Sequence, residues 1–118
     1  MALWLYAGLS ERIPKRARAL IGKGPACVSP LVALELAYMH EIGRARDPVP
    51  TMLAALRKSI GLEVADASLP ALIDSAMGLS WTRDPFDRLI SAHAIVADAP
   101  LVTADRTILE HLPLATWD

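Results

Sequence analysis

Apolar and polar positions along the chain change period in a way that predicts alternating helices and short strands. Proline, glycine and capping residues mark the ends of helices predicted at Ala2–Gly8, Pro14–Ile21, Pro30–Ile42, about Thr51–Ile60, Leu69–Met77, Pro85–Ala97 and from Arg106 onward. Short apolar runs predict strands at Ala26–Ser29, Leu62–Ala65, Leu101–Thr103 and Leu114–Trp117. This alternation predicts an α/β fold, with a mostly parallel sheet and helices on both faces.

The segment from Arg83 to Asp105 has the most distinctive pattern. Asp84 can cap a helix that begins at Pro85, and Asp87 falls in its first turn, where a carboxylate interacts favourably with the helix dipole. This helix is apolar on nearly every side, which is typical of a buried helix. Asp105 follows the next apolar run and can cap the last helix. The two acids flanking this helix and strand therefore serve either metal chemistry or capping.

A third acid, Glu35, lies in the helix predicted at Pro30–Ile42. At ~100° per residue, it falls in the middle of an apolar arc. The arc consists of Leu31, Val32, Met39 and Ile42. A carboxylate that faces a core needs a cation, a hydrogen-bond donor or a shared proton, because burying it unpaired is unfavourable. A structural salt bridge to Arg83 or Arg88 is the alternative to a bound cation.

Length and composition restrict the class of protein. A chain of 118 residues fits one domain with a single core, and a hydrophobic content of 53% excludes a disordered chain. No apolar run approaches the ~18 residues of a membrane-spanning helix, and the apolar start lacks the basic residues of a signal peptide. The single cysteine, Cys27, excludes a disulfide framework and favours a cytoplasmic protein. We expect its side chain to fill the core.

The net charge of −1 hides an uneven distribution. Residues 11–23 contain five basic residues and one acid, whereas residues 61–118 contain nine acids and three arginines. A basic helix together with an acidic pocket would suit a polyanion held near metal ions. The alternative is that the basic residues form a solvated helix face.

Glu35, Asp87 and Asp105 each follow a predicted strand or lie at a helix start. In open α/β sheets this is the carboxyl edge, where ligands bind, so we expect the three acids to meet in one cleft. Three carboxylates together repel one another unless a cation is present. Ligation by oxygen alone suits Mg²⁺ or Mn²⁺ rather than zinc, and such an ion can activate water for displacement at phosphorus.

Two sequence blocks carry a family resemblance. Arg83-Asp-Pro-Phe-Asp-Arg-Leu-Ile-Ser-Ala-His-Ala, followed by Pro100-Leu-Val-Thr-Ala-Asp, resembles the carboxyl-terminal signature of PIN-domain nucleases, particularly VapC-type toxins. Val28-Ser-Pro-Leu-Val-Ala-Leu-Glu-Leu-Ala resembles the segment that carries the family's second acid. The likeness extends over most of the chain, including Trp4-Leu and residues 17–21.

The resemblance implies a single PIN-like domain, a three-layer sandwich with a mostly parallel central sheet. It also implies a divalent-metal endoribonuclease that uses Mg²⁺ or Mn²⁺ to hydrolyse RNA phosphodiester bonds. Such proteins are toxins of type II toxin–antitoxin pairs, inhibited by a cognate antitoxin and usually homodimeric. Glu35, Asp87 and Asp105 match the metal-binding, catalytic acids of the family.

Further residues take roles from the same resemblance. Ser29 and Thr103 match polar positions near the pocket, while Asp84 caps its helix and can support the ligands. Arg83 and Arg88 either pair with acids or contact phosphate, and the predicted RNA contacts are Lys15, Arg16 and Arg83. We expect His93 to be a core or boundary histidine, and the packing residues to be Trp4, Trp81 and Trp117.

One feature departs from the family pattern. The family's first strand normally ends in an aspartate just before the Leu-Trp-Leu helix, and here Met1 occupies that region. We expect one of two explanations. Either residues 1–118 are an N-terminally incomplete domain, or the protein is a degenerate, non-catalytic PIN-like protein that binds antitoxin or RNA.

Overall fold

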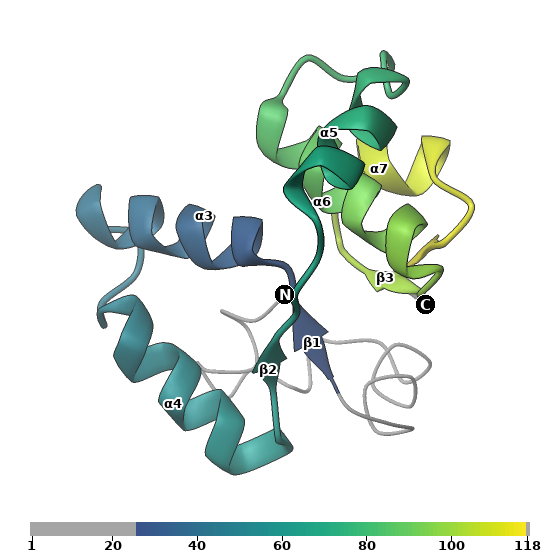
Figure 1. The fold of residues 1–118 in the computed structure, drawn as a ribbon. Coiled ribbons are helices and arrows are strands. Elements are labelled where there is room, and N and C mark those ends of the chain that lie inside the picture. The colour runs from purple at the N-terminus through teal and green to yellow at the C-terminus, as the bar shows by residue number, and fades with distance from the viewer. Residues whose placement is uncertain (1–25, 118) are drawn as a thin grey trace. The chain divides into compact units, whose positions relative to one another are not determined.

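The structure is a computed structural model that describes residues 26–117 (Figure 1). The helices predicted at Ala2–Gly8 and Pro14–Ile21, with Trp4, Lys15 and Arg16, lie outside the described residues. The described residues fall into two compact units, 26–65 and 66–117, and each is described by itself. The single domain expected from the sequence stays a prediction.

The first unit contains two helices between two short strands. Its elements are β1 (Cys27–Val28), α3 (Pro30–Glu41), α4 (Val49–Ile60) and β2 (Glu63–Val64). β1 and β2 are parallel, with Cys27 opposite Glu63 and Val28 opposite Val64. Two backbone hydrogen bonds connect the strands. Glu63 N donates to Ala26 O, just before β1, at 3.0 Å, and Ala65 N, just after β2, donates to Val28 O at 2.8 Å.

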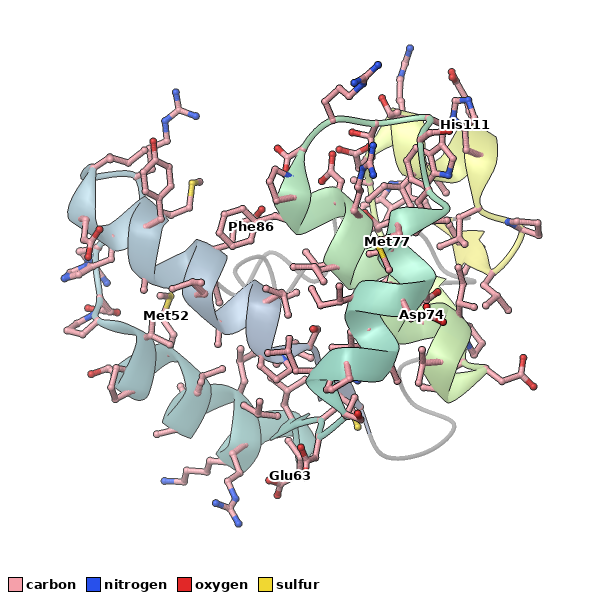
Figure 2. All side chains as sticks on the ribbon, turned by 45° about the horizontal axis from the view of Figure 1, so that its top comes forward. Met52, Glu63, Asp74, Met77, Phe86 and His111 are labelled. Atoms are coloured by element: carbon pink, nitrogen blue, oxygen red, sulfur yellow. The ribbon has the colours of Figure 1, made fainter. Side chains whose placement is uncertain are left out.

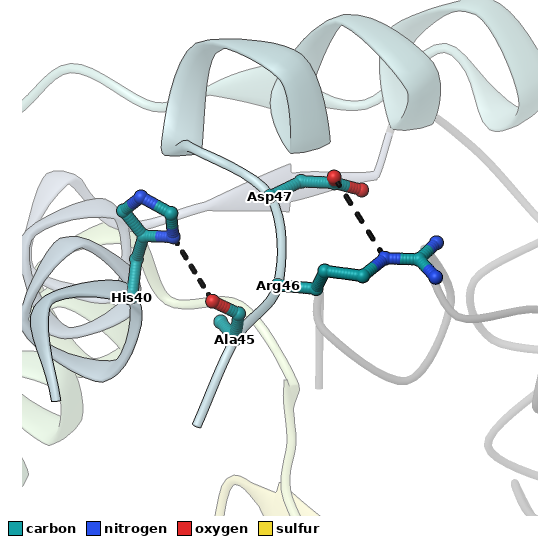
Figure 3. Close-up of polar contacts among 4 residues, drawn as sticks. All are labelled: His40, Ala45, Arg46 and Asp47. Carbon is teal, nitrogen blue, oxygen red and sulfur yellow. Dashed lines mark hydrogen bonds and ion pairs between the residues drawn. The ribbon is translucent and has the colours of Figure 1, made fainter. Parts of the chain in front are cut away.

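Each helix of the first unit has a proline in its first turn, where the missing N–H is not needed. α4 begins at Val49 rather than at about Thr51, because Pro50 fits this first turn. Between α3 and α4, His40 Nδ1 donates to Ala45 O at 2.9 Å and closes the loop against the end of α3 (Figure 3). The neighbouring Arg46 Nε lies 4.0 Å from Asp47 Oδ1 (Figure 3).

One apolar cluster holds the first unit together. Its buried members are Val28, Leu36, Ala45, Met52, Leu56 and Leu62. Met52 and Leu56, one turn apart on α4, are only 0% and 1% exposed, and Met52 lies between α3 and α4 (Figure 2). The prediction that Cys27 fills the core is wrong, because its side chain is exposed while the next residue, Val28, points inward. Side chains alternate along a strand, so only one of the two can face the cluster.

Gly61 ends α4 with a backbone conformation that favours glycine. Its φ is +71°, and its N–H donates to the carbonyl groups of Leu56 and Arg57. We expect Gly61→Ala to lower the free energy of unfolding by about 1–2 kcal/mol, because a Cβ is strained in the left-handed region. Urea denaturation measures this change. Gly78→Ala is the matched control at the end of another helix, since Gly78 has a φ of −85°; an equal loss there would contradict the explanation.

The second unit has three helices and two strands. Its elements are α5 (Leu69–Met77), α6 (Pro85–Ala97), β3 (Leu101–Val102), α7 (Arg106–His111) and β4 (Ala115–Thr116). α5 packs against α6, and β3 is parallel to β4, with Leu101 opposite Ala115. A buried cluster of Ala94, Ile108 and Leu112 joins α6 to α7, with Trp81 packed against it. Trp81 is thus a packing residue, as predicted, and Trp117 is half-buried.

The middle of α6 is buried on every side. The four consecutive residues Ser91–Ala94 point in four directions around the helix axis, and all four are buried. The prediction of a buried helix is therefore confirmed for its middle, and His93, 6% exposed, is a core residue as predicted. The prediction is wrong at the carboxyl end, where Ile95 and Val96 are 39% and 43% exposed. Ser91 Oγ is buried without a hydrogen-bond partner in the described part of the chain.

Helices and strands follow one another in the predicted order, and both strand pairs are parallel, which confirms the α/β class. All four predicted strands are present, each paired over two residues rather than three or four. The bounds predicted for α5 and α6 are those observed. No helix among residues 26–117 has the length and apolar character needed to cross a membrane.

Candidate metal centre

Two helix starts in the second unit share one local structure. Thr82 Oγ1 accepts the N–H of Asp84 at 3.2 Å, and Thr103 Oγ1 accepts the N–H of Asp105 at 3.1 Å. In each case a threonine fixes the turn that presents an aspartate two residues later. This Thr-x-Asp repeat is visible in the sequence, but Thr82 was not among the predicted site residues.

Both aspartates cap the helices that follow them, as predicted. Asp84 Oδ1 accepts the N–H of Phe86 at 2.8 Å and that of Asp87 at 3.2 Å. Asp105 Oδ1 accepts the N–H of Ile108 at 2.9 Å. Capping and metal binding do not exclude each other, because a carboxylate has two oxygens and about four lone-pair sites. Asp105 is exposed, so its carboxylate is open to a cation as well as to the helix.

Asp87 lies in the first turn of α6 and is half-buried. It is thus further from bulk water than Asp84 and Asp105, which are exposed. Arg88, the next residue, donates from Nε to the carbonyl oxygen of Thr82 at 2.8 Å. This bond ties the segment before α6 to the first turn of the helix, a structural contact that the sequence did not predict. Arg83 is exposed.

Glu35 does not lie where the helical pattern placed it. The buried face of α3 is centred on Leu36, which is 6% exposed, with Val32 and Met39 packed against the same cluster. Glu35 is half-buried and sits 100° from Leu36 around the helix. Two members of the predicted arc, Val32 and Met39, pack against the core as predicted, whereas Ile42 is 48% exposed. The buried face of α3 is therefore displaced from the predicted centre at Glu35 toward Leu36.

Ser29 also has a local role that the structure shows. It is the N-cap of α3, and its Oγ accepts the N–H of Leu31 at 3.3 Å. Ser29 follows β1 directly and so lies at the carboxyl end of that strand, while its place near a pocket stays a prediction. Thr103 likewise follows β3 directly.

The structure divides the predicted acids between the two units. Glu35 belongs to the first unit, and Asp87 and Asp105 belong to the second, so their convergence in one cleft stays a prediction. The alternative, a salt bridge from Glu35 to Arg83 or Arg88, is likewise untested. No group of three or more His, Cys, Asp or Glu residues within 26–117 is placed to hold a metal ion. A surface hollow in the first unit is lined by none of the predicted site residues.

The chemistry of the predicted donors fits a hard divalent cation. All three residues offer carboxylate oxygens, the ligands that Mg²⁺ and Mn²⁺ prefer. The predicted ligands include neither histidine nor cysteine, the residues that bind softer metals. His93 is buried in the middle of α6, and Cys27 is exposed on β1.

Two substitutions of Asp84 can separate the contribution of its helix cap to stability from the contribution of its charge. We expect Asp84→Ala to lower the free energy of unfolding by about 1 kcal/mol, because two backbone N–H groups lose their acceptor. Asp84→Asn should leave stability nearly unchanged, since asparagine caps helices as well as aspartate does. Thermal unfolding of both variants measures the difference, and equal losses would show that charge rather than capping stabilises this turn.

A comparison with protein-family models decides the family. The model described as PIN domain matches residues 2–112, nearly the whole chain. The chain belongs to the PIN domain family. PIN domains are typically nucleases, and they generally depend on divalent metals. Neither a curated protein nor a solved structure matches the chain.

Proposed function

We propose that this PIN domain protein is an endoribonuclease that depends on Mg²⁺ or Mn²⁺ and hydrolyses RNA phosphodiester bonds. The observation that carries the proposal is the family match over residues 2–112. The DPFDR and LVTAD blocks support it, because they place Asp87 and Asp105 at two helix starts of one unit. We further propose that the protein is the toxin of a type II toxin–antitoxin pair, a cytoplasmic homodimer inhibited by its cognate antitoxin.

In this proposal Glu35, Asp87 and Asp105 hold the divalent ion. When bound, such an ion supplies a water activated for attack at phosphorus and neutralises charge on the phosphate. The half-buried position of Asp87 supports its assignment as a ligand, because burial strengthens its attraction to a cation. Asp105 is oriented by its own cap and by the Thr103 turn.

The remaining predicted residues have supporting roles. Arg88 and Asp84 fix the start of α6 and hence the backbone at Asp87. Ser29 and Thr103 hold the chain at the ends of β1 and β3. Arg83, which is exposed, and the basic residues Lys15 and Arg16 are proposed to contact RNA phosphates. Such contacts make binding weaken as salt concentration rises.

Cleavage of a labelled RNA by the purified full-length protein tests this function. We expect cleavage in Mg²⁺ or Mn²⁺, its loss in EDTA, and its return when either ion is added in excess. A column fraction that cleaves equally in EDTA would contradict the metal mechanism. RNA binding without cleavage under any of these ions would instead favour the degenerate, non-catalytic protein.

A further inference from the structure

Two aromatic rings in the second unit form a stack that the proposed catalysis does not use. The rings of Trp81 and His111 are 3° from parallel, with centroids 5.1 Å apart. Trp81 is half-buried against the cluster of Ala94, Ile108 and Leu112. His111 is exposed and lies in the last turn of α7, at the edge of the unit (Figure 2).

The imidazole of His111 is held by a second contact. Its Nδ1 donates to the carbonyl oxygen of Thr107, one turn earlier on α7, at 2.9 Å. The stack and this hydrogen bond together restrict both rotations of the side chain. Trp81 covers one face of the ring, and His111 as a whole residue is exposed, so the side chain retains surface that a ligand can contact. An aromatic face fixed in this way loses little conformational entropy when a ligand binds.

A flat ring with delocalised electrons is the ligand that such a face suits best. We propose that the outer face of His111 stacks on a nucleobase of a single-stranded RNA, with Trp81 as its support. The inference rests on the proposed function, because it assigns a substrate-binding position to the same protein. Aromatic side chains bind successive bases in this way with little preference for sequence, since every base has a π face.

Residues 66–117 contain seven acids against three arginines, so attraction of RNA to this unit depends on individual arginines. Arg83 follows Trp81 by two residues, and Arg106 begins α7; both are exposed. Either guanidinium can attract the phosphate backbone of an RNA whose base lies on His111. Glu110 precedes His111 in the sequence but projects 100° away around the helix, so its carboxylate is not directed along the face of the ring.

Binding of a short, fluorescently labelled oligoriboadenylate tests the inference. The measurement uses the protein with Asp87→Asn, which is expected to suppress cleavage, and follows anisotropy in a Mg²⁺ buffer. We expect His111→Ala to raise Kd about 10-fold, and His111→Phe to restore most of the affinity because an aromatic face is retained. His40→Ala is the matched control, since His40 makes the same Nδ1–carbonyl hydrogen bond at 2.9 Å in the first unit.

Each outcome decides a separate question. If the parent binds the oligonucleotide and His111→Ala binds equally well, the stacking site is wrong and the proposed nuclease is unaffected. If His111→Phe is as weak as His111→Ala, a polar contact rather than stacking explains the loss, and the inference is overturned. If the parent binds no oligonucleotide, the stacking site is wrong, and cleavage by the protein without Asp87→Asn decides the proposed function separately. Melting temperatures of all variants identify any loss that comes from unfolding.

Discussion

Asp87→Asn is expected to slow metal-dependent RNA cleavage at least ~100-fold, which corresponds to about 2.7 kcal/mol in activation free energy. The amide has the shape of the carboxylate but lacks its charge, and a hard divalent ion binds a neutral amide oxygen far more weakly. The backbone N–H of Asp87, rather than its side chain, takes part in the Asp84 cap, so this cap is retained. Single-turnover cleavage at saturating Mg²⁺ or Mn²⁺ measures the rate.

The matched control lies at the other end of the same helix. Asp98 is the C-cap of α6, is exposed, and has a φ of +49°. Asp98→Asn makes the same change in charge at a position where asparagine adopts the left-handed conformation readily. We expect cleavage to be unchanged. Equal losses in the two variants would point to a general effect of charge, and a fully active Asp87→Asn would remove Asp87 from the metal site.

Leu56→Ala is expected to produce the largest loss of stability, about 2–5 kcal/mol in the free energy of unfolding. Leu56 is 1% exposed and lies in the cluster that joins α3, α4 and the β1–β2 pair. The truncation removes buried apolar surface and leaves a cavity that the neighbouring side chains fill only in part. Against a total stability of ~5–15 kcal/mol, such a loss is severe. Urea unfolding measures it.

Leu34→Ala is the control for this prediction. Leu34 lies on α3 and is 57% exposed, so the same chemical change should alter stability by less than about 0.5 kcal/mol. Similar losses in the two variants would mean that Leu34 is buried in solution, for example against another chain. A changed denaturant slope in Leu56→Ala would indicate either a change in the compactness of one of the two states or the loss of two-state unfolding.

Short-range interactions account for what the sequence determined. The caps at Asp84 and Asp105 join a side chain to backbone groups two or three residues away. The bounds of α5 and α6 follow from proline and capping residues at their starts and from the residues that stop them. The parallel strand pairs follow from the alternation of strands and helices, because parallel strands need a crossover connection. The caps and helix bounds require no knowledge of a distant part of the chain, whereas the strand pairs join residues 36 and 14 positions apart.

The sequence predicts less of the candidate site than of the helices and strands. The sequence predicted Glu35, Asp87 and Asp105 as metal ligands by residue type and position, which stays a prediction, and the family match supports the nuclease class. It also identified Asp84 and Asp105 as the N-caps of α6 and α7. The meeting of all three acids requires Glu35 to approach Asp87 and Asp105, which follow it by 52 and 70 positions, and no local pattern specifies such contacts.

Tertiary packing decided which side chains became buried. α3 carries apolar residues on several sides, so its helical period alone did not reveal that Leu36, rather than Glu35, faces the core. β1 is only two residues long, and its pairing with β2 turned Val28 inward and left Cys27 exposed. The stack of Trp81 on His111 joins residues 30 positions apart. Burial and long-range stacking depend on which surface a neighbouring element covers, and that is settled only when the elements pack.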